Sequence, residues 1–398
     1  MKKIVFSLFV ASALFQSCSS DDDGGQTSQV EAPTTYTFLR DGNSSVSYSG
    51  QTTRILMAEE LVAGLKVETN TEETLDAMFA HIEGASDFSD ADLNASDKSV
   101  RSKVAASTDF FSANTTEANE IKADFDGWIA SQVNDVFPNW SFTAAAGEAG
   151  ALQQAGGGTT RYLNEKGLEY NQAFAKGLIG GLMIDQILNN YLSPAVLDAG
   201  TNIADNDSEV LEEGKTYTSM EHKWDEAFGY LYGNEADAAN PVLDVDQFLS
   251  EYLDRVEADE DFAGIASKIY NAFILGRAAI VANNYTVRDA QAEIIKENIS
   301  VIPAVRAVYY LQSGKNNLGI DNASAFHALS EAYGFIYSLQ FTRQPNSNSP
   351  YLTKTEVDAY LEELMEGNGF WDVTTNTLDE ISDEISAKFG FTTEEASN

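Results

Sequence analysis

Two histidine–glutamate pairs are the parts of this sequence best suited to chemistry. His222 and Glu226 stand in the pattern His-x-x-x-Glu-Ala-aromatic-Gly-aromatic, which His327 and Glu331 repeat. Residues four apart on an α-helix lie on one face, so each pair can form a hydrogen bond or hold one metal ion with both side chains. If the two copies face each other across a pseudo-twofold axis, the four side chains would supply a zinc or iron site in a helical bundle.

A second interpretation gives the same residues a packing role, in which each glutamate fixes its histidine by a hydrogen bond. The same helical stripe continues with Gly229 and Gly334. Glycine inside a helix costs about 1 kcal/mol relative to alanine, so we expect a close helix crossing or a bound group there. Stripes that converge on one cavity would favour binding or catalysis. Stripes buried against separate neighbours would favour packing.

Most of the chain has apolar residues at helical spacing and only seven prolines, which predicts an all-α fold. We expect residues 36–53 to be an extended segment or short hairpin, and 144–160 to be a flexible connection. Thr-x-x-Glu capping boxes are predicted at Thr218, Thr353 and Thr377. The predicted helices are 54–66, 71–84, 98–110, 116–136, 161–193, 219–233, 245–257, 262–284, 287–299, 303–312, 323–340, 354–366 and 378–389.

The repeat also predicts the domain organisation. Asn189-Asn190-Tyr191 is echoed by Asn283-Asn284-Tyr285, ahead of the stronger His-x-x-x-Glu repeat. We therefore expect two related helical bundles, at about 36–240 and 241–398.

The N-terminus has the layout of a bacterial lipoprotein precursor. Lys2 and Lys3 precede an apolar run that ends at Phe15, and the only cysteine, Cys18, is followed by serines and aspartates. Residues 1–17 are therefore predicted to be a signal peptide, Cys18 the lipidated residue and 18–35 an acidic tether. The tether resembles the export signal of surface-exposed lipoproteins, so we expect an outer-membrane lipoprotein displayed at the cell surface.

The chain is strongly acidic, with 24 Lys and Arg against 62 Asp and Glu and a formal net charge of −38. Such a charge would repel nucleic acid and anionic membrane surfaces. Beyond the leader, no run approaches the roughly 20 apolar residues of a membrane span, so we expect membrane contact through the lipid on Cys18 alone. The only cysteine is the predicted lipidation site, so we expect no thiol nucleophile in the mature protein.

The opening of the predicted helical body matches a family pattern at Tyr36, Phe38, Ser45, Val46, Ser47, Tyr48, Gly50, Gln51 and Arg54. The sequence resembles the imelysin-like lipoproteins, and more closely an uncharacterised family of acidic Gram-negative surface lipoproteins. The resemblance implies two related helical bundles, and for imelysin-type proteins a role in iron uptake or a metallopeptidase activity. Their Gly-x-His-x-x-Glu motif differs here, since Met220 and Asp225 occupy its Gly and Glu positions and Ala325 and Ser330 do so in the second copy.

Three functions are open at this point. The first is a binding or accessory lipoprotein that helps capture metal, especially iron, or another nutrient, with an uptake system as partner. The second is a metal-dependent peptidase with His222 or His327 as ligand and Glu226 or Glu331 as ligand or general base, although the HExxH signature is absent. The third is a structural or protein-binding lipoprotein without a metal. We favour the first, which is not an enzyme.

Overall fold

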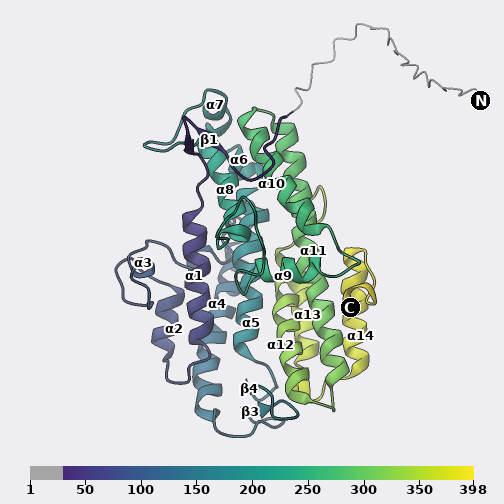
Figure 1. Cartoon of the computed structure of the whole chain (residues 1–398). Coiled ribbons are helices and arrows are strands. Elements are labelled where there is room, and N and C mark those ends of the chain that lie inside the picture. Colours follow the sequence, from purple (N-terminus) through teal and green to yellow (C-terminus); the bar gives the residue numbers. More distant parts are fainter. Residues whose placement is uncertain (1–29) are drawn as a thin grey trace, which may run out of the picture.

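The computed structural model describes residues 30–398, and the protein is mainly all-α, as predicted (Figure 1). The predicted signal peptide, Cys18 and most of the tether lie outside the described residues. The helices are α1 (Ser49–Gly64), α2 (Glu72–Phe79), α3 (Ala91–Asn94), α4 (Thr115–Ser131), α5 (Tyr170–Leu178), α6 (Pro194–Leu197), α7 (Asn202–Asp207), α8 (Ser219–Tyr232), α9 (Leu249–Glu257), α10 (Ile265–Val281), α11 (Tyr285–Asn317), α12 (Asn322–Ser338), α13 (Lys354–Leu364) and α14 (Thr375–Phe389). Among these, no helix combines the length and hydropathy needed to cross a membrane.

Two short antiparallel hairpins complete the described fold. β1 (Leu39–Arg40) pairs with β2 (Asn43–Ser44), and β3 (Gly150–Gln153) pairs with β4 (Thr160–Leu163). The first hairpin confirms the extended N-terminal segment, although α1 begins at Ser49 rather than at residue 54. The second corrects the predicted flexible connection, and because β4 takes residues 160–163, the predicted helix 161–193 begins only at Tyr170.

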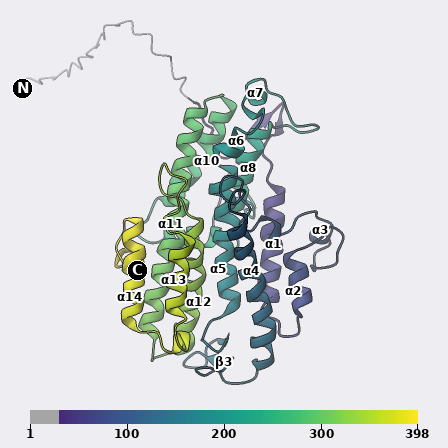
Figure 2. The ribbon, with the colours of Figure 1, turned by 180° about the vertical axis from the view of Figure 1, so that it is seen from behind.

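A nearly continuous buried helix runs through the middle of the molecule. α5 continues into the π-helical segments η4 (Ile179–Ile184) and η5 (Ile187–Tyr191), whose residues are buried all round. A helix that is buried on every face needs neighbours on every face. Figure 2 shows, from behind, α5 lying between α4 and α12. α5, η4 and η5 together thus form a central axis on which other helices pack.

Other predicted elements differ from the structure for physical reasons. The predicted helix 98–110 is only a short 3-10 turn, Arg101–Lys103, because the amides of Ala106 and Ser107 donate to the buried Asp185 carboxylate instead of to a helical ladder. The two predicted helices at 287–299 and 303–312 are one helix, α11. Pro303 lacks the amide for one backbone hydrogen bond of this helix. The residues before and after it are buried, so packing in the core keeps the helix continuous.

The capping predictions are confirmed in two cases out of three. Thr218 and Thr353 each form a capping box with the glutamate three residues on. The third prediction is wrong, since Thr374, not Thr377, accepts the amide hydrogen bond that starts α14. Thr377 instead supplies that amide.

The described residues share one hydrophobic core that extends from Tyr36 to Ala396. α12, from the predicted second bundle, packs along α5, from the predicted first bundle. A core shared by both predicted bundles does not mark a boundary between them. The division near residue 240 stays a prediction. The Asn-Asn-Tyr echo does not mark equivalent positions: Asn189 and Asn190 lie in η5, whereas Asn283 and Asn284 lie in the turn before α11.

Candidate functional site

The first His-x-x-x-Glu copy lies on α8, which begins at the Thr218 capping box. The His222 Nδ1 atom lies 3.0 Å from the backbone oxygen of Ser47, and the ring stacks on Tyr217 with centroids 4.7 Å apart. Since a carbonyl oxygen only accepts, Nδ1 carries the proton in this hydrogen bond. The Nε2 atom is therefore left for a further contact.

The second copy lies on α12 and has matching surroundings. The His327 Nδ1 atom lies 2.5 Å from Glu169 Oε2, and its Nε2 atom lies 3.7 Å from Glu331 Oε2. Ser47 lies just before α1, and Glu169 lies just before α5. Each histidine therefore meets the start of a neighbouring helix, so the sequence repeat corresponds to two helix pairs, α8 on α1 and α12 on α5.

The repeated glycines confirm the prediction of close helix crossings. A Cβ atom at Gly229 would lie 2.4 Å from the Cβ of Tyr48, and one at Gly334 would lie 2.6 Å from the Cβ of Lys176. Both distances are below ordinary van der Waals contact. The crossings therefore require glycine, which offsets its cost in helix propensity.

The repeated glutamates have equivalent but chemically different partners. Glu226 accepts hydrogen bonds from Gln51 Nε2 on α1 at 3.2 Å and from Lys223 at 2.7 Å. Burial raises the Glu226 pKa, but the Lys223 charge and the hydrogen bonds from Lys223 and Gln51 act together with the nearby His222 to bring it below its usual value. Glu331 instead lies 3.7 Å from the buried ammonium of Lys176 on α5. The second copy thus contains a buried ion pair where the first has an amide.

The structure does not bring the two pairs together. α8 packs on α1 and on η5, at the C-terminal end of the central axis, whereas α12 packs on α5 at its N-terminal end. Within residues 30–398, no group of three or more His, Cys, Asp and Glu side chains is arranged to hold a metal ion. The predicted four-ligand arrangement of His222, Glu226, His327 and Glu331 is therefore not formed, because the two helices have different neighbours.

Each histidine lines a cavity of its own. The His222 pocket encloses about 450 Å³ and is lined by Ser47, Ser49, Gly50, Gln51, Arg54, Lys98, Lys103, Tyr191, Glu212, Lys215, Tyr217, His222 and Glu226. The His327 cleft, between α9, α11 and α12, encloses about 780 Å³, and His327, Glu331 and Arg306 are among its lining residues.

The His222 pocket gathers positive charge in a very acidic chain. Four of the chain's 24 Lys and Arg line it, namely Arg54, Lys98, Lys103 and Lys215, against two carboxylates. Sequence analysis missed this set because its members come from separate segments. Only Arg54 carried a signal, since it belongs to the opening that supports the family resemblance.

Arg54 and Lys103 are the deepest cations of the pocket. Arg54 is 7% exposed and donates to the carbonyl oxygens of Gly50 and Ser99, with no ion pair inside residues 30–398. Burial and the nearby Arg54 charge lower the pKa of Lys103. The N-terminus of α1 also lines the pocket, and in the described chain no side chain caps it. All three features favour an anion.

A buried charge network holds the N-terminal strap, residues 36–48, in place, and Ser47 of the strap lines this pocket. Arg277 on α10 is fully buried and donates to Glu221 at 2.8 Å and to Asp225 at 3.0 Å. From the strap, Arg40 donates to Glu221 and the Tyr36 hydroxyl donates to Asp225. Burial raises the pKa of Asp225 to about 6, while the Arg277 charge opposes that rise. The network thus positions the Ser47 carbonyl that orients His222.

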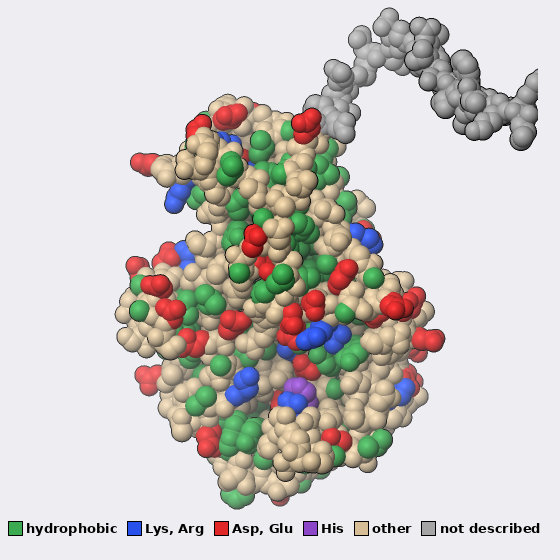
Figure 3. All heavy atoms as spheres, in the orientation of Figure 1, with side chains coloured by type: hydrophobic (Ala, Val, Ile, Leu, Met, Phe, Trp, Pro, Cys, Tyr) green, Lys and Arg blue, Asp and Glu red, His purple; other side chains and the backbone are tan. Residues whose placement is uncertain are grey.

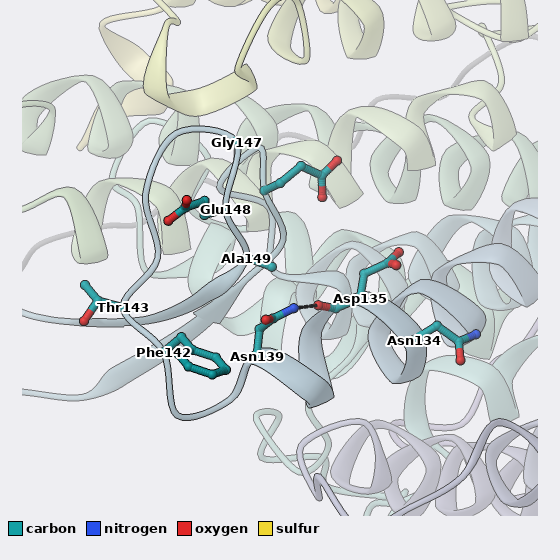
Figure 4. A pocket seen from close by; sticks show the side chains of 9 residues that line it. Asn134, Asp135, Asn139, Phe142, Thr143, Gly147, Glu148 and Ala149 are labelled. Carbon is teal, nitrogen blue, oxygen red and sulfur yellow. Dashed lines mark hydrogen bonds between the residues drawn. The ribbon is translucent and has the colours of Figure 1, made fainter.

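A further cavity, of about 750 Å³, lies beside the β3–β4 hairpin (Figure 4). Its side chains are spread around the loop, and the one contact drawn is the 2.8 Å hydrogen bond from Asn139 to the Asp135 carbonyl. Its charged lining residues are Asp135, Glu148 and Glu165. Nothing there resembles the charge arrangement of the other two cavities.

Comparison with protein families gives one match, a domain of unknown function (DUF4856) over residues 33–392. The chain belongs to this family. The DUF4856 match includes the strap, both helix pairs, the lining of the His222 pocket and, apart from Asn398, the lining of the His327 cleft. Neither the curated proteins nor the solved structures gave a match.

Proposed function

We propose that this DUF4856 protein is a surface lipoprotein of the outer membrane that binds a small, multiply charged anion in the His222 pocket. The observation that carries the proposal is the convergence of four Lys and Arg side chains on one pocket of a chain with a net charge of −38. Phosphate and carboxylate groups share the chemistry that such a pocket recognises.

The depth of Arg54 supports an anionic ligand in particular. A guanidinium that is 7% exposed is costly to bury without a carboxylate, and carbonyl oxygens offset only part of that cost. An anion in the pocket would pair with Arg54 and Lys103 together. The pocket volume of about 450 Å³ suits a small molecule.

The proposal includes metal uptake only if the metal arrives as an anionic complex. The separation of the two histidine pairs leaves each with too few ligands for a bare ion, but an anionic iron complex carries its own ligands and would be recognised by charge. The imelysin-like relationship, which rests on the opening residues and the helical body, is part of the same proposal. Membrane attachment through Cys18 would place the pocket at the cell surface.

Calorimetric titration of the purified protein tests the proposal with citrate, inorganic phosphate, ferric citrate and zinc chloride. We expect saturable one-site binding of citrate, weaker binding of phosphate, and a loss of about tenfold or more in citrate affinity in Lys103→Met. The matched control is Lys268→Met on the exposed side of α10, which lines neither cavity. Ferric citrate binding tighter than citrate would assign the iron complex as ligand.

Two results would contradict the proposal. One is the absence of saturable anion binding, and the other is equal citrate affinity in Lys103→Met and the parent protein. Stoichiometric zinc binding without anion binding would favour the hypothesis that the histidine–glutamate pairs bind a metal ion. The membrane anchor is tested separately, since Cys18→Ser should move the protein from the detergent phase to the aqueous phase.

A further inference from the structure

The His327 cleft contains a buried cation that forms no ion pair with a carboxylate of the described residues. Arg306 on α11 is 7% exposed and lines the cleft. Within residues 30–398 it makes no ion pair, and its buried Nε atom has no hydrogen-bond partner. Its guanidinium instead lies over Tyr309, Tyr310 and Tyr252, at 4.0, 4.7 and 5.7 Å from the ring centroids. These contacts offset part of the burial cost but leave the charge unneutralised.

The other charges at the base of the cleft are already paired. Glu331 lies beside Lys176 and accepts a hydrogen bond from the Tyr252 hydroxyl at 3.3 Å. Glu169 lies against the His327 ring. Arg306 is therefore the unpaired charge at the base of the cleft. A carboxylate is the group that its planar guanidinium binds best.

The rim of the cleft has the opposite charge. Asp259, Glu260 and Asp261 follow the end of α9 and line the cleft, and within the described chain no Lys or Arg lies within ion-pair distance of them. Figure 3 shows Lys and Arg side chains flanked by Asp and Glu on the face formed by α9, α11 and α12. A ligand with several negative charges would be repelled at this rim, whereas a cationic group would be attracted.

We infer that the His327 cleft binds a zwitterionic ligand, an amino acid or short peptide, whose carboxylate pairs with Arg306 and whose ammonium group faces Asp259 and Asp261. The volume of about 780 Å³ leaves room for more than one residue. This inference does not rest on the proposed function, because no residue lines both the cleft and the His222 pocket.

The test is a calorimetric titration of the purified protein with triglycine, glycine, acetyl-triglycine and triglycine amide. We expect triglycine to bind, with about a ten- to hundredfold loss for the amide, which lacks the carboxylate for Arg306. Acetylation removes the ammonium group from the more exposed rim, so it should cost only about three- to fivefold. Glycine binding as tightly as triglycine would assign a free amino acid, and weaker glycine binding a peptide.

Two variants locate the site. Arg306→Met should abolish triglycine binding without lowering thermal stability, because it removes an unpaired buried charge. If that variant fails to fold, Asp259→Asn/Asp261→Asn decides instead, and it should remove the difference between triglycine and acetyl-triglycine. The control Arg101→Met changes an arginine that lines neither cavity. Absence of triglycine binding, or equal binding of triglycine and its amide, would overturn the inference.

Discussion

The His222 pocket and the His327 cleft repeat one motif but differ in charge. In both, a histidine Nδ1 meets the segment just before a neighbouring helix, and a glycine allows two helices to cross closely. The first site gathers four cations around two carboxylates, whereas the second places one buried arginine behind an acidic rim. The repeat thus preserves helix packing, and the residues around it set what each cavity can bind.

The two sites also differ in how they are held together. The His222 pocket is lined in part by Ser47 of the strap, which is tied to α8 and α10 through Arg277, Glu221 and Asp225. The His327 cleft is formed by helices that pack directly on each other. Substitutions can therefore affect one site without the other.

Removal of Arg277 should have the largest effect. Arg277→Ala leaves two buried carboxylates, Glu221 and Asp225, without their main cation, so we expect a loss of about 3–5 kcal/mol in the free energy of unfolding, measured in urea. Citrate binding should be lost while triglycine binding remains. The control Arg101→Ala removes an arginine that is 37% exposed and lines neither cavity. A loss of both ligands with the fold intact would show that the sites are not separate.

The repeated glutamates should differ in their importance for stability. Glu331→Gln removes the anionic partner of the buried Lys176, so we expect a loss of roughly 3 kcal/mol. Glu226→Gln leaves Lys223, which is 33% exposed and can remain hydrated, so its loss should be less than about 1 kcal/mol. Equal losses in urea unfolding would mean that the two pairs play the same structural role.

The Glu226 effect should also depend on pH. The Glu226 pKa is lower in the folded protein than in the unfolded chain, so its stabilising contribution is present above the unfolded pKa and is lost as the pH falls through the folded value. The difference in stability between Glu226→Gln and the parent protein should therefore shrink below about pH 4. A difference that is constant from pH 7 to pH 3 would contradict the ionised state of Glu226.

The buried Asp246, just before α9, should destabilise the protein at neutral pH. Burial raises its pKa to about 7, above the unfolded value of about 3.9, so stability is lost as the pH rises from about 4 to 7. Asp246→Asn keeps the acceptor for the Phe248 amide and should be more stable at pH 8 by roughly 2 kcal/mol. Thermal unfolding at pH 4 should show no such gain.

Alanine at the crossing glycines should have a moderate effect at both sites. Gly229→Ala and Gly334→Ala each place a methyl group closer than 3 Å to a neighbouring side chain, so we expect a loss of about 1–2 kcal/mol in urea unfolding. The matched control is Gly127→Ala in α4, where a Cβ atom would have no neighbour within 4 Å apart from the backbone of its own helix. Alanine there should be neutral or slightly stabilising. Tolerance at either crossing would mean that the helices can separate without cost.

Features that depend on nearby residues could be predicted from the sequence. The all-α class, two capping boxes, the N-terminal hairpin and the close glycine crossings follow from spacing along one helix or turn. The partner of α12 could not be predicted, because α5 lies about 150 residues earlier and the choice depends on the whole core. For the same reason, sequence analysis grouped His222 with His327 and did not find Arg54 with Lys103 or the unpaired Arg306.

The most direct test of the account is a paired calorimetric titration of citrate and triglycine into the parent protein, Lys103→Met and Arg306→Met. Two independent sites predict that saturation with citrate leaves triglycine affinity unchanged, that Lys103→Met weakens citrate alone, and that Arg306→Met abolishes triglycine binding alone. Competition between the two ligands, or loss of both in one variant, would contradict the account.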